Sequence, residues 1–409
     1  MNVLYVVGTC LTKNTSANMS HNSYVQGLLE NGCELDILMA EDSWGQEDAA
    51  LPTWEEARYF RYGSVSFGDR LRKKVRRAVH AAPVSQSAAS GDAAAPGTGT
   101  SGLKAAIRSC IKKAFYICFP QDPVYPLEAT WLKKARSFRG NKTYDLVVSN
   151  SSPAASHKLV LQLIADKKLS CKRWVQIWED PWYYDLYGGH SEQEKQEEHM
   201  LLKAATEVYY VSPLTLSYQK RFFPDCAHKM KHIPLPYLEV AGDNPAAWVS
   251  GSFGYFGDYY SQTRNLLPFY EALKASGFSG SIYGDSDLNL ASTDAITVSG
   301  RVTLDVLADV QAKTEVLVHL CNLRGGQIPG KIYHYSATKK PILFILDGTR
   351  EEQDIIRSYF QQFDRYYFCK NTAESILETL QLIRSDIAAG KTWKTVTAFS
   401  PKEIVSQLL

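Results

Sequence analysis

The sequence has no apolar run near the length of about 20 residues that a membrane-spanning helix requires. Its first apolar stretch, Val3–Val7, lacks a basic segment before it, so we expect a first β-strand here and not a signal peptide. The eight cysteines form no Cys-x-x-Cys pair, which disfavours a zinc site or a redox motif. Without an export signal, free thiols and a cytoplasmic location are expected.

Neither sign of charge dominates. The chain has 45 Lys and Arg against 43 Asp and Glu, a net charge of +2. Charged partners must therefore be bound by local patches and not by the field of the whole molecule. A length of 409 residues exceeds what one hydrophobic core usually supports, so we expect two domains.

Strand-like and helix-like segments alternate through both halves of the chain. This alternation predicts an α/β protein with two doubly wound parallel sheets. We expect a first domain over 1–237, a linker over 238–251, a second domain over 252–395, and a final helix within 396–409 that packs back on the first domain. The expected strands are Asn2–Val7, Glu34–Met39, Asp145–Ser149, Trp174–Trp178 and Glu207–Val211, then Ser252–Phe256, Ser281–Tyr283, Glu315–Leu320, Pro341–Leu346 and Tyr366–Phe368.

The segment 81–102 consists almost wholly of Ala, Ser, Gly, Pro and Thr, a composition that predicts a disordered insertion. The surrounding stretch 69–113 carries ten Lys or Arg and two Asp. A basic amphipathic helix is expected near 103–116. It either faces the core with a solvated side or docks on an anionic membrane leaflet. Nucleic acid is not expected as a partner, because no recognised binding module is present.

In open α/β sheets, ligands bind beyond the carboxyl ends of the strands. After the first strand comes a polar loop with Gly8, Thr9, Lys13 and Asn14, which is neither a P-loop nor a Gly-x-Gly-x-x-Gly turn. It is either an ordinary loop or a wall of an acceptor site.

Two later loops of the first half carry polar and aromatic residues. His157 lies one turn into a helix, where a histidine can bind a substrate hydroxyl or phosphate or serve a structural role. Glu179, Asp180 and Trp182 follow a strand directly. Carboxylates bind sugar hydroxyls and can stabilise positive charge at an anomeric carbon, and aromatic rings stack on sugars. The alternative is a helix cap with core aromatics.

The second half offers two anion-binding segments. The loop around Gly257 leads to Arg264, and the glycine-rich turn with Arg324 leads to a helix that starts near Lys331. Backbone N–H groups and cations at such turns suit a diphosphate. Asp285-Ser286-Asp287 matches a metal-binding Asp-x-Asp, but it follows a second-domain strand, and we expect no metal there.

The segments 254–264 and 321–343, with Gly300-Arg301-Val302 between them, resemble the donor-binding half of glycosyltransferase family 4. Ser151-Ser152-Pro153 followed by His157, and Asp180-Pro181-Trp182, resemble members that build bacterial surface polysaccharides. The resemblance covers nearly the whole chain outside 81–102.

This resemblance implies the GT-B fold, with two Rossmann-like domains around a nucleotide-sugar cleft. It also implies transfer with retention and without a bound metal, to a saccharide or lipid-linked hydroxyl, at the inner face of the cell membrane if the acceptor is lipid-linked. The residue patterns and the resemblance together assign His157, Asp180 and Glu179 to catalysis, Gly257, Arg264, Arg301, Arg324, Gly326, Gln327, Pro329, Gly330, Lys331 and His334 to the donor, and Gly8, Thr9, Lys13, Asn14 and Trp182 to the acceptor.

One departure from the family pattern leaves alternatives open. The family carries a Glu-x7-Glu motif, but Gly326 and His334 stand at the two positions, and no Asp or Glu occurs in 321–340. A histidine can form one hydrogen bond to a ribose but cannot copy a bidentate carboxylate. A nucleotide-sugar epimerase of the same fold and a catalytically silent binding subunit therefore remain as alternatives.

Overall fold

The computed structural model describes residues 1–42, 47–48, 51–65, 122–185, 191–238, 244–324 and 326–409. The insertion predicted at 81–102, the basic residues of 69–113 and the helix predicted at 103–116 lie outside these residues. Within the described ranges, no helix is both long and apolar enough to cross a membrane.

The first domain is built on a seven-stranded sheet with the order β3-β2-β1-β4-β5-β6-β7, and each neighbouring pair is parallel. Its central strands are buried on both faces, which explains their continuous apolar sequences. The elements are β1 (Asn2–Val7), α1 (Ser16–Glu30), β2 (Glu34–Ala40), β3 (Arg58–Tyr62), α4 (Ala129–Ala135), β4 (Thr143–Asn150), α5 (Ala155–Ala165), β5 (Ser170–Trp178), α6 (Glu192–Ala204), β6 (Glu207–Tyr210), α7 (Pro213–Phe222), η1 (Pro224–Lys229) and β7 (Met230–His232).

The second domain is built on a six-stranded parallel sheet with the order β10-β9-β8-β11-β12-β13. Its first strand begins at Val249, inside the range 238–251 expected as linker. The elements are η2 (Pro245–Ala247), β8 (Val249–Phe256), α8 (Leu267–Ser276), β9 (Ser279–Tyr283), β10 (Ile296–Ser299), α9 (Leu304–Lys313), β11 (Thr314–Leu320), α10 (Lys331–Ser336), β12 (Ile342–Leu346), α11 (Arg350–Phe360), η3 (Gln361–Phe363), β13 (Tyr366–Lys370) and α12 (Ala373–Ala388).

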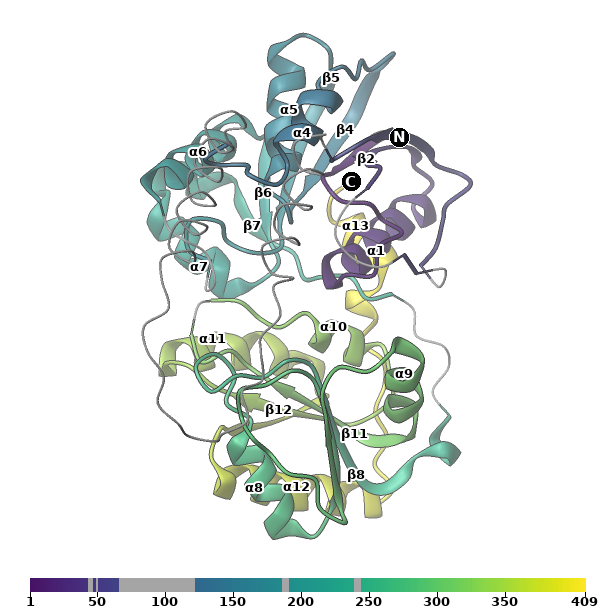
Figure 1. The fold of residues 1–409 in the computed structure, drawn as a ribbon, viewed down its shortest axis with the longest axis vertical. Coiled ribbons are helices and arrows are strands. Elements are labelled where there is room, and N and C mark those ends of the chain that lie inside the picture. Colours follow the sequence, from purple (N-terminus) through teal and green to yellow (C-terminus); the bar gives the residue numbers. More distant parts are fainter. Residues whose placement is uncertain (43–46, 49–50, 66–121, 186–190, 239–243, 325) are drawn as a thin grey trace, which may run out of the picture.

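After α12 the chain returns to the first domain. Following η4 (Thr397–Phe399), helix α13 (Pro401–Ser406) lies against α1 (Figure 1). The two helices approach so closely at Gly27 that a Cβ there would stand 2.2 Å from the carbonyl oxygen of Pro401, so only glycine fits. Asn31 adds a hydrogen bond of 3.0 Å to the carbonyl of Lys402.

The two domains share one apolar cluster. It joins Val211 and Leu235 of the first domain with Ile328 and Tyr333 of the second. The Tyr333 hydroxyl also donates to the Val211 carbonyl at 3.1 Å. The carboxyl-end loops of the two sheets are therefore in direct contact at the domain junction, between the upper and lower halves of Figure 1.

Candidate active site at the domain junction

A glutamine of the second domain binds two carboxylates of the first. Gln327, in the turn after β11, donates through Nε2 to Asp180 Oδ1 at 2.9 Å and lies 3.2 Å from Asp185 Oδ1. Both aspartates belong to the loop after β5. The structure thus brings two predicted site residues, Gln327 and Asp180, together from opposite domains.

The residue before Gln327 is held by helix α7. The carbonyl oxygen of Gly326 accepts hydrogen bonds from Ser212 Oγ at 2.8 Å and from Thr215 Oγ1 at 2.9 Å. Gly326 has a φ of +71°, and a Cβ there would lie 2.9 Å from Cδ2 of Tyr218. This position therefore requires glycine for both backbone and steric reasons.

Burial acts on both acidic residues after β5. It raises the pKa of Glu179 well above its usual value, and Asp180 adds to this, while Asn150 opposes it. Burial also raises the pKa of Asp180, to about 6, with a further contribution from Asp185 and opposition from Gln327. At neutral pH, Asp180 is therefore mostly ionised, and burial favours the neutral form of Glu179.

Glu179 lies next to a cluster of buried polar residues that the sequence analysis missed. His21 is fully buried, with Nδ1 3.1 Å from the Tyr5 hydroxyl and 3.6 Å from Glu179 Oε1. Asn150 donates to the same Tyr5 hydroxyl at 2.9 Å. Burial lowers the pKa of His21 to about 4, so it is neutral at pH 7. These polar groups connect β1, α1, β4 and the end of β5.

A capping signal could have pointed to His21. The sequence analysis expects a polar loop after the first strand, and the helix that follows begins at Ser16 as α1. Thr15 is its N-cap, and its side chain accepts from the Asn18 amide. His21 is therefore a helical residue, which places its ring against the end of the sheet.

His157 lies in the core of the first domain. It is fully buried, its Nδ1 is 2.7 Å from Ser149 Oγ, and its ring centroid is 4.3 Å from that of Trp178. Trp174 donates to the same Ser149 oxygen at 2.8 Å. Burial lowers the pKa of His157 to about 3, so the ring is neutral and packed.

The aromatic residues after β5 divide between core and surface. Trp182 packs on the first-domain core, with its ring centroid 5.4 Å from that of Tyr125. Tyr184 is 42% exposed and lies 4.6 Å, between ring centroids, from Phe222 of α7. The solvent-facing ring of this loop is therefore Tyr184, which the sequence analysis does not single out.

The loop after β1 makes its contacts inside the first domain. The four residues of this loop that are predicted to bind the acceptor each form a hydrogen bond within that domain. They are Gly8 N–H to Ser156 Oγ at 2.9 Å, Thr9 Oγ1 to Asn18 at 2.7 Å, Lys13 Nζ to Glu47 at 3.1 Å and Asn14 Nδ2 to Asp48 at 2.7 Å.

The second domain contributes a cluster of cations. Lys331, at the start of α10, has solvent-exposed surface, but the end of its side chain packs towards the second-domain loop, with Cε 3.9 Å from where a Cβ on Gly257 would stand. Burial of the amine lowers the pKa of Lys331 to about 8, with Arg264 and Arg301 adding to this and Asp258 opposing it. Lys331 and Arg264 therefore lie close enough to interact electrostatically beside the glycine loop after β8.

Arg301 is already paired with carboxylates. Its guanidinium hydrogen-bonds Asp258 through Nε at 3.1 Å and through a second nitrogen, and its Nε is 3.1 Å from Asp285. Arg324 is exposed in the turn after β11. Lys331 interacts electrostatically with both Arg264, which hydrogen-bonds Tyr255, and Arg301.

The remaining predicted donor residues line the turn into α10. Gly330 faces the first domain, with its Cβ position 3.2 Å from Cδ1 of Leu235, and Pro329 precedes it. His334 is partly exposed one turn further on. Burial lowers the pKa of His334 to about 4, and Lys331 adds to this, so the ring is neutral and can donate or accept one hydrogen bond.

Possible metal ligands among the described residues already have partners. Asp287 accepts from the amide and hydroxyl of Ser261 at 2.8 and 2.6 Å. His199, Asp225 and Cys226 offer ligand atoms within 4.8 Å of one another, on α6 and η1. Lys203 Nζ, however, already lies 3.2 Å from an Asp225 oxygen and would compete with a metal ion.

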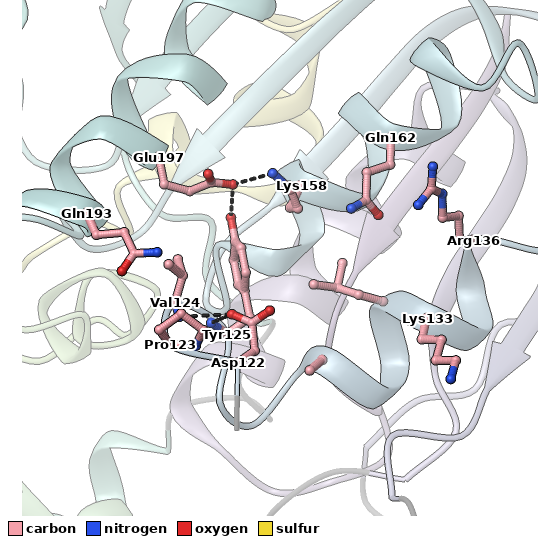
Figure 2. Close-up of a pocket in the computed structure, with 12 residues that line it drawn as sticks. Asp122, Pro123, Val124, Tyr125, Lys133, Arg136, Lys158, Gln162, Gln193 and Glu197 are labelled. Atoms are coloured by element: carbon pink, nitrogen blue, oxygen red, sulfur yellow. Dashed lines mark hydrogen bonds and ion pairs between the residues drawn. The ribbon is translucent and has the colours of Figure 1, made fainter. Parts of the chain in front are cut away.

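A pocket of about 400 Å³ lies elsewhere on the first domain, between α4, α5 and α6 (Figure 2). One carboxylate oxygen of Glu197 accepts from the Tyr125 hydroxyl at 3.0 Å and lies 2.6 Å from Lys158 Nζ. None of the predicted site residues lines this pocket. The candidate site is therefore the domain junction.

No protein-family model and no curated protein matches the chain. Solved structures match it over nearly its full length. The catalytic domain of starch synthase IV from Arabidopsis thaliana, bound to ADP and acarbose, has a TM-score of 0.54 at 10% identity, covering 99% of this chain and 95% of that one. Anabaena HepE in complex with UDP and glucose has a TM-score of 0.52 at 12% identity, covering 99% and 94%.

An α-glucosyltransferase in complex with UDP and a 13-mer DNA containing a HMU base also matches. Its TM-score is 0.52 at 10% identity, covering 100% of this chain and 94% of that one. Together with the two parallel sheets, these similarities confirm the expected GT-B fold. Membership of glycosyltransferase family 4 stays a prediction.

Proposed function

We propose that the chain is a glycosyltransferase that moves a sugar from a nucleoside diphosphate sugar to a hydroxyl of a saccharide or lipid-linked acceptor. The observation that carries this proposal is the contact between Gln327 and Asp180. It places the carboxylates of the first domain beside the turn from which α10 and Lys331 begin.

In this reaction the bond from the anomeric carbon to the diphosphate breaks, a bond from that carbon to the acceptor oxygen forms, and the acceptor hydroxyl gives its proton to the departing diphosphate. The departing diphosphate gains negative charge, which Lys331 and Arg264 would stabilise. Asp180, ionised at neutral pH, would accept a hydrogen bond from the acceptor hydroxyl. Burial favours the neutral form of Glu179, which would donate a hydrogen bond to a sugar oxygen.

Two further features belong to the proposal. The similar structures hold UDP or ADP, which favours a nucleoside diphosphate as the leaving group here. We further propose transfer with retention and without a metal, as in family 4, with the cations of the second domain neutralising the diphosphate. His157 would support the acceptor side from the core, and His334 would contact the ribose.

A thermal-shift panel of UDP, GDP, ADP, CMP and dTDP, with and without magnesium, tests the proposal. A nucleotide at about 100 times its dissociation constant should add about 2.7 kcal/mol of stability. We expect one nucleotide to shift the wild type, independently of magnesium, and Arg264→Ala to weaken the shift. Turnover of Arg264→Ala should fall roughly 10²–10³-fold. A wild type unmoved by all five nucleotides would overturn the proposal.

The segment 321–340 contains no Asp or Glu, unlike the family pattern. This favours a second candidate, a catalytically silent nucleotide-binding subunit. It would show the thermal shift but no turnover with any acceptor. An epimerase would instead convert the donor sugar in the absence of acceptor, which product analysis would reveal.

The basic residues of 69–113 could bind the membrane that carries a lipid-linked acceptor. We propose peripheral docking on an anionic leaflet at the inner face of the membrane. Flotation with liposomes that contain or lack anionic lipid tests this, and equal, negligible binding to both would contradict it.

A further inference from the structure

Helix α6 carries a buried carboxylate that neither the sequence analysis nor the proposed reaction uses. Glu198 is 0% exposed, although it follows Glu197, which faces the pocket of Figure 2. Within the described part of the chain, no Lys, Arg or His lies within ion-pair distance of it. A buried carboxylate without a cation must be stabilised by hydrogen-bond donors.

Those donors come from two different elements. The backbone N–H of Tyr183 donates to Glu198 Oε2 at 2.8 Å, and Gln219 Nε2 donates to Oε1 at 2.8 Å. A further hydrogen bond comes from the backbone of Trp182. Glu198 therefore ties the loop after β5 to helix α7.

These two elements are the ones that hold the domain junction. The loop after β5 carries Asp180 and Asp185, which bind Gln327. The N-terminal turn of α7 binds the carbonyl of Gly326. Glu198 thus connects the two first-domain elements, the loop after β5 and helix α7, that bind the second-domain turn at Gly326 and Gln327.

We propose that Glu198 is a positioning residue: its carboxylate fixes the loop after β5 relative to α7, and so sets where Asp180 meets Gln327. The catalytic consequence of this role rests on the proposed function, but the positioning itself does not. Gln219 shares the role, because it carries the link to α7.

Protonation should weaken the hold of Glu198 on the loop after β5. Burial raises the pKa of Glu198 to about 7, opposed by its donors Tyr183, Gln219 and Trp182. Tyr210 of β6 faces it from the sheet, and the pKa of Tyr210 is raised by burial and further by Glu198. Gln219 Oε1 is buried without a hydrogen-bond partner, so its amide can rotate to accept the proton of a neutral Glu198. That rotation would keep the link to α7, whereas the amides of Tyr183 and Trp182 would lose a charged acceptor.

Amide hydrogen exchange of the full chain tests the positioning. Exchange at residues 182 and 183 would be followed at pH 6, 7 and 8, corrected for chemical exchange, in wild type, Glu198→Gln and Glu198→Ala. Glu197→Gln is the matched control, because it removes a carboxylate from the same helix that does not contact the loop. Loss of a charged acceptor should speed exchange at 182 and 183 by roughly tenfold at pH 8.

The pH profile distinguishes positioning from general stability. In wild type, protection of these amides should fall from pH 8 to pH 6, whereas in Glu198→Gln it should be independent of pH. Unchanged exchange in Glu198→Gln, an equal effect of Glu197→Gln, or equal acceleration along the central strands would overturn the positioning. If the variants do not fold, a flat wild-type profile would overturn it.

The same samples separate this inference from the proposed function. Exchange is measured without a nucleotide, so a wild type that shows the expected profile but binds none of the five nucleotides loses only the proposed function. Nucleotide binding together with a flat exchange profile removes only the positioning role of Glu198.

Discussion

Gln327 of the second domain donates a hydrogen bond of 2.9 Å to Asp180 of the first, and this contact joins the loops at the carboxyl ends of the two sheets. A neutral amide is well suited to this place, since Asp185 is only 3.2 Å away and both carboxylates need a donor. The charge of residue 327 should therefore control how closely the domains approach.

Gln327→Glu should open the junction. The new carboxylate would face Asp180 and Asp185, and like charges at hydrogen-bond distance repel. We expect a larger radius of gyration by small-angle X-ray scattering at pH 8 than at pH 5, where Asp180, with its pKa of about 6, is mostly protonated. Gln362→Glu is the control, because Gln362 is exposed and donates to the nearby Tyr359 carbonyl. Identical scattering of Gln327→Glu and wild type at pH 8 would contradict this.

Lys331 should make nucleotide affinity depend on pH. Its amine has a pKa of about 8 in the free protein, and a bound diphosphate should raise that value. Binding should therefore take up protons near pH 8, and affinity for the bound nucleotide should fall as the pH rises above 8, by up to about tenfold per unit. Isothermal titration calorimetry at pH 7, 8 and 9 measures this.

Lys331→Met should bind more weakly at pH 7 and lose the pH dependence, because it keeps the length of the side chain without the charge. Lys274→Met is the matched control on exposed α8, where the lysine contacts Glu271 at 3.4 Å. A wild-type affinity that is constant from pH 7 to 9 would remove Lys331 from the diphosphate site.

Much of the fold follows from local pattern. Val3–Val7 is apolar at every position because the strand is buried on both faces of a parallel sheet. The turn at 321–330 could also be located, since a buried strand ends there and glycines precede a helix. Helix α6 escaped prediction because it is very polar, although Ser191 and Glu194 form a capping box.

The site depended on contacts that sequence spacing cannot give. His21 meets Glu179 only because β1, β4 and β5 are neighbours in the sheet. Arg301 was assigned to the donor by resemblance, but its pairing with Asp258 and Asp285 is set by the order β10-β9-β8. Which ring after β5 faces solvent, Tyr184 and not Trp182, likewise depends on tertiary packing.

Gly326→Ala should destabilise the protein more than the same substitution at another glycine with the same backbone conformation. Gly277 is the control: its φ of +72° matches the +71° of Gly326, but a Cβ on Gly277 meets nothing within 4 Å. We expect a loss of about 1 kcal/mol for Gly277→Ala and about 2–4 kcal/mol for Gly326→Ala, measured by urea unfolding.

The additional loss of stability in Gly326→Ala would come from its Cβ, which would lie 2.9 Å from Tyr218 and displace the turn from α7. It should be accompanied by weaker nucleotide binding. Equal losses for the two variants would show that Tyr218 yields without cost and that the turn is held elsewhere.

Five histidines with lowered pKa values should make the protein sensitive to acid. Burial lowers the pKa of each to about 3 or 4, whereas the unfolded value is about 6.5. Each must gain a proton on unfolding below that value, so its contribution to stability is present above pH 6.5 and is lost as the pH falls towards 4. The residues are His21, His157, His232, His319 and His334.

Three buried carboxylates act in the opposite direction. Glu179, Asp180 and Glu198 have raised pKa values, so each releases a proton on unfolding near pH 5 and favours the folded state as the pH falls. Five protons taken up against three released leave roughly two, which corresponds to a loss of about 3 kcal/mol per pH unit between pH 6 and 5. Urea unfolding at pH 7, 6 and 5 measures the slope. His319→Gln removes one of the five histidines, so the slope should fall by about one proton.

His319 suits this test because it lies on β11 beside Phe344, outside the proposed reaction. A free energy of unfolding that rises from pH 6 to 5 would mean that the carboxylates dominate.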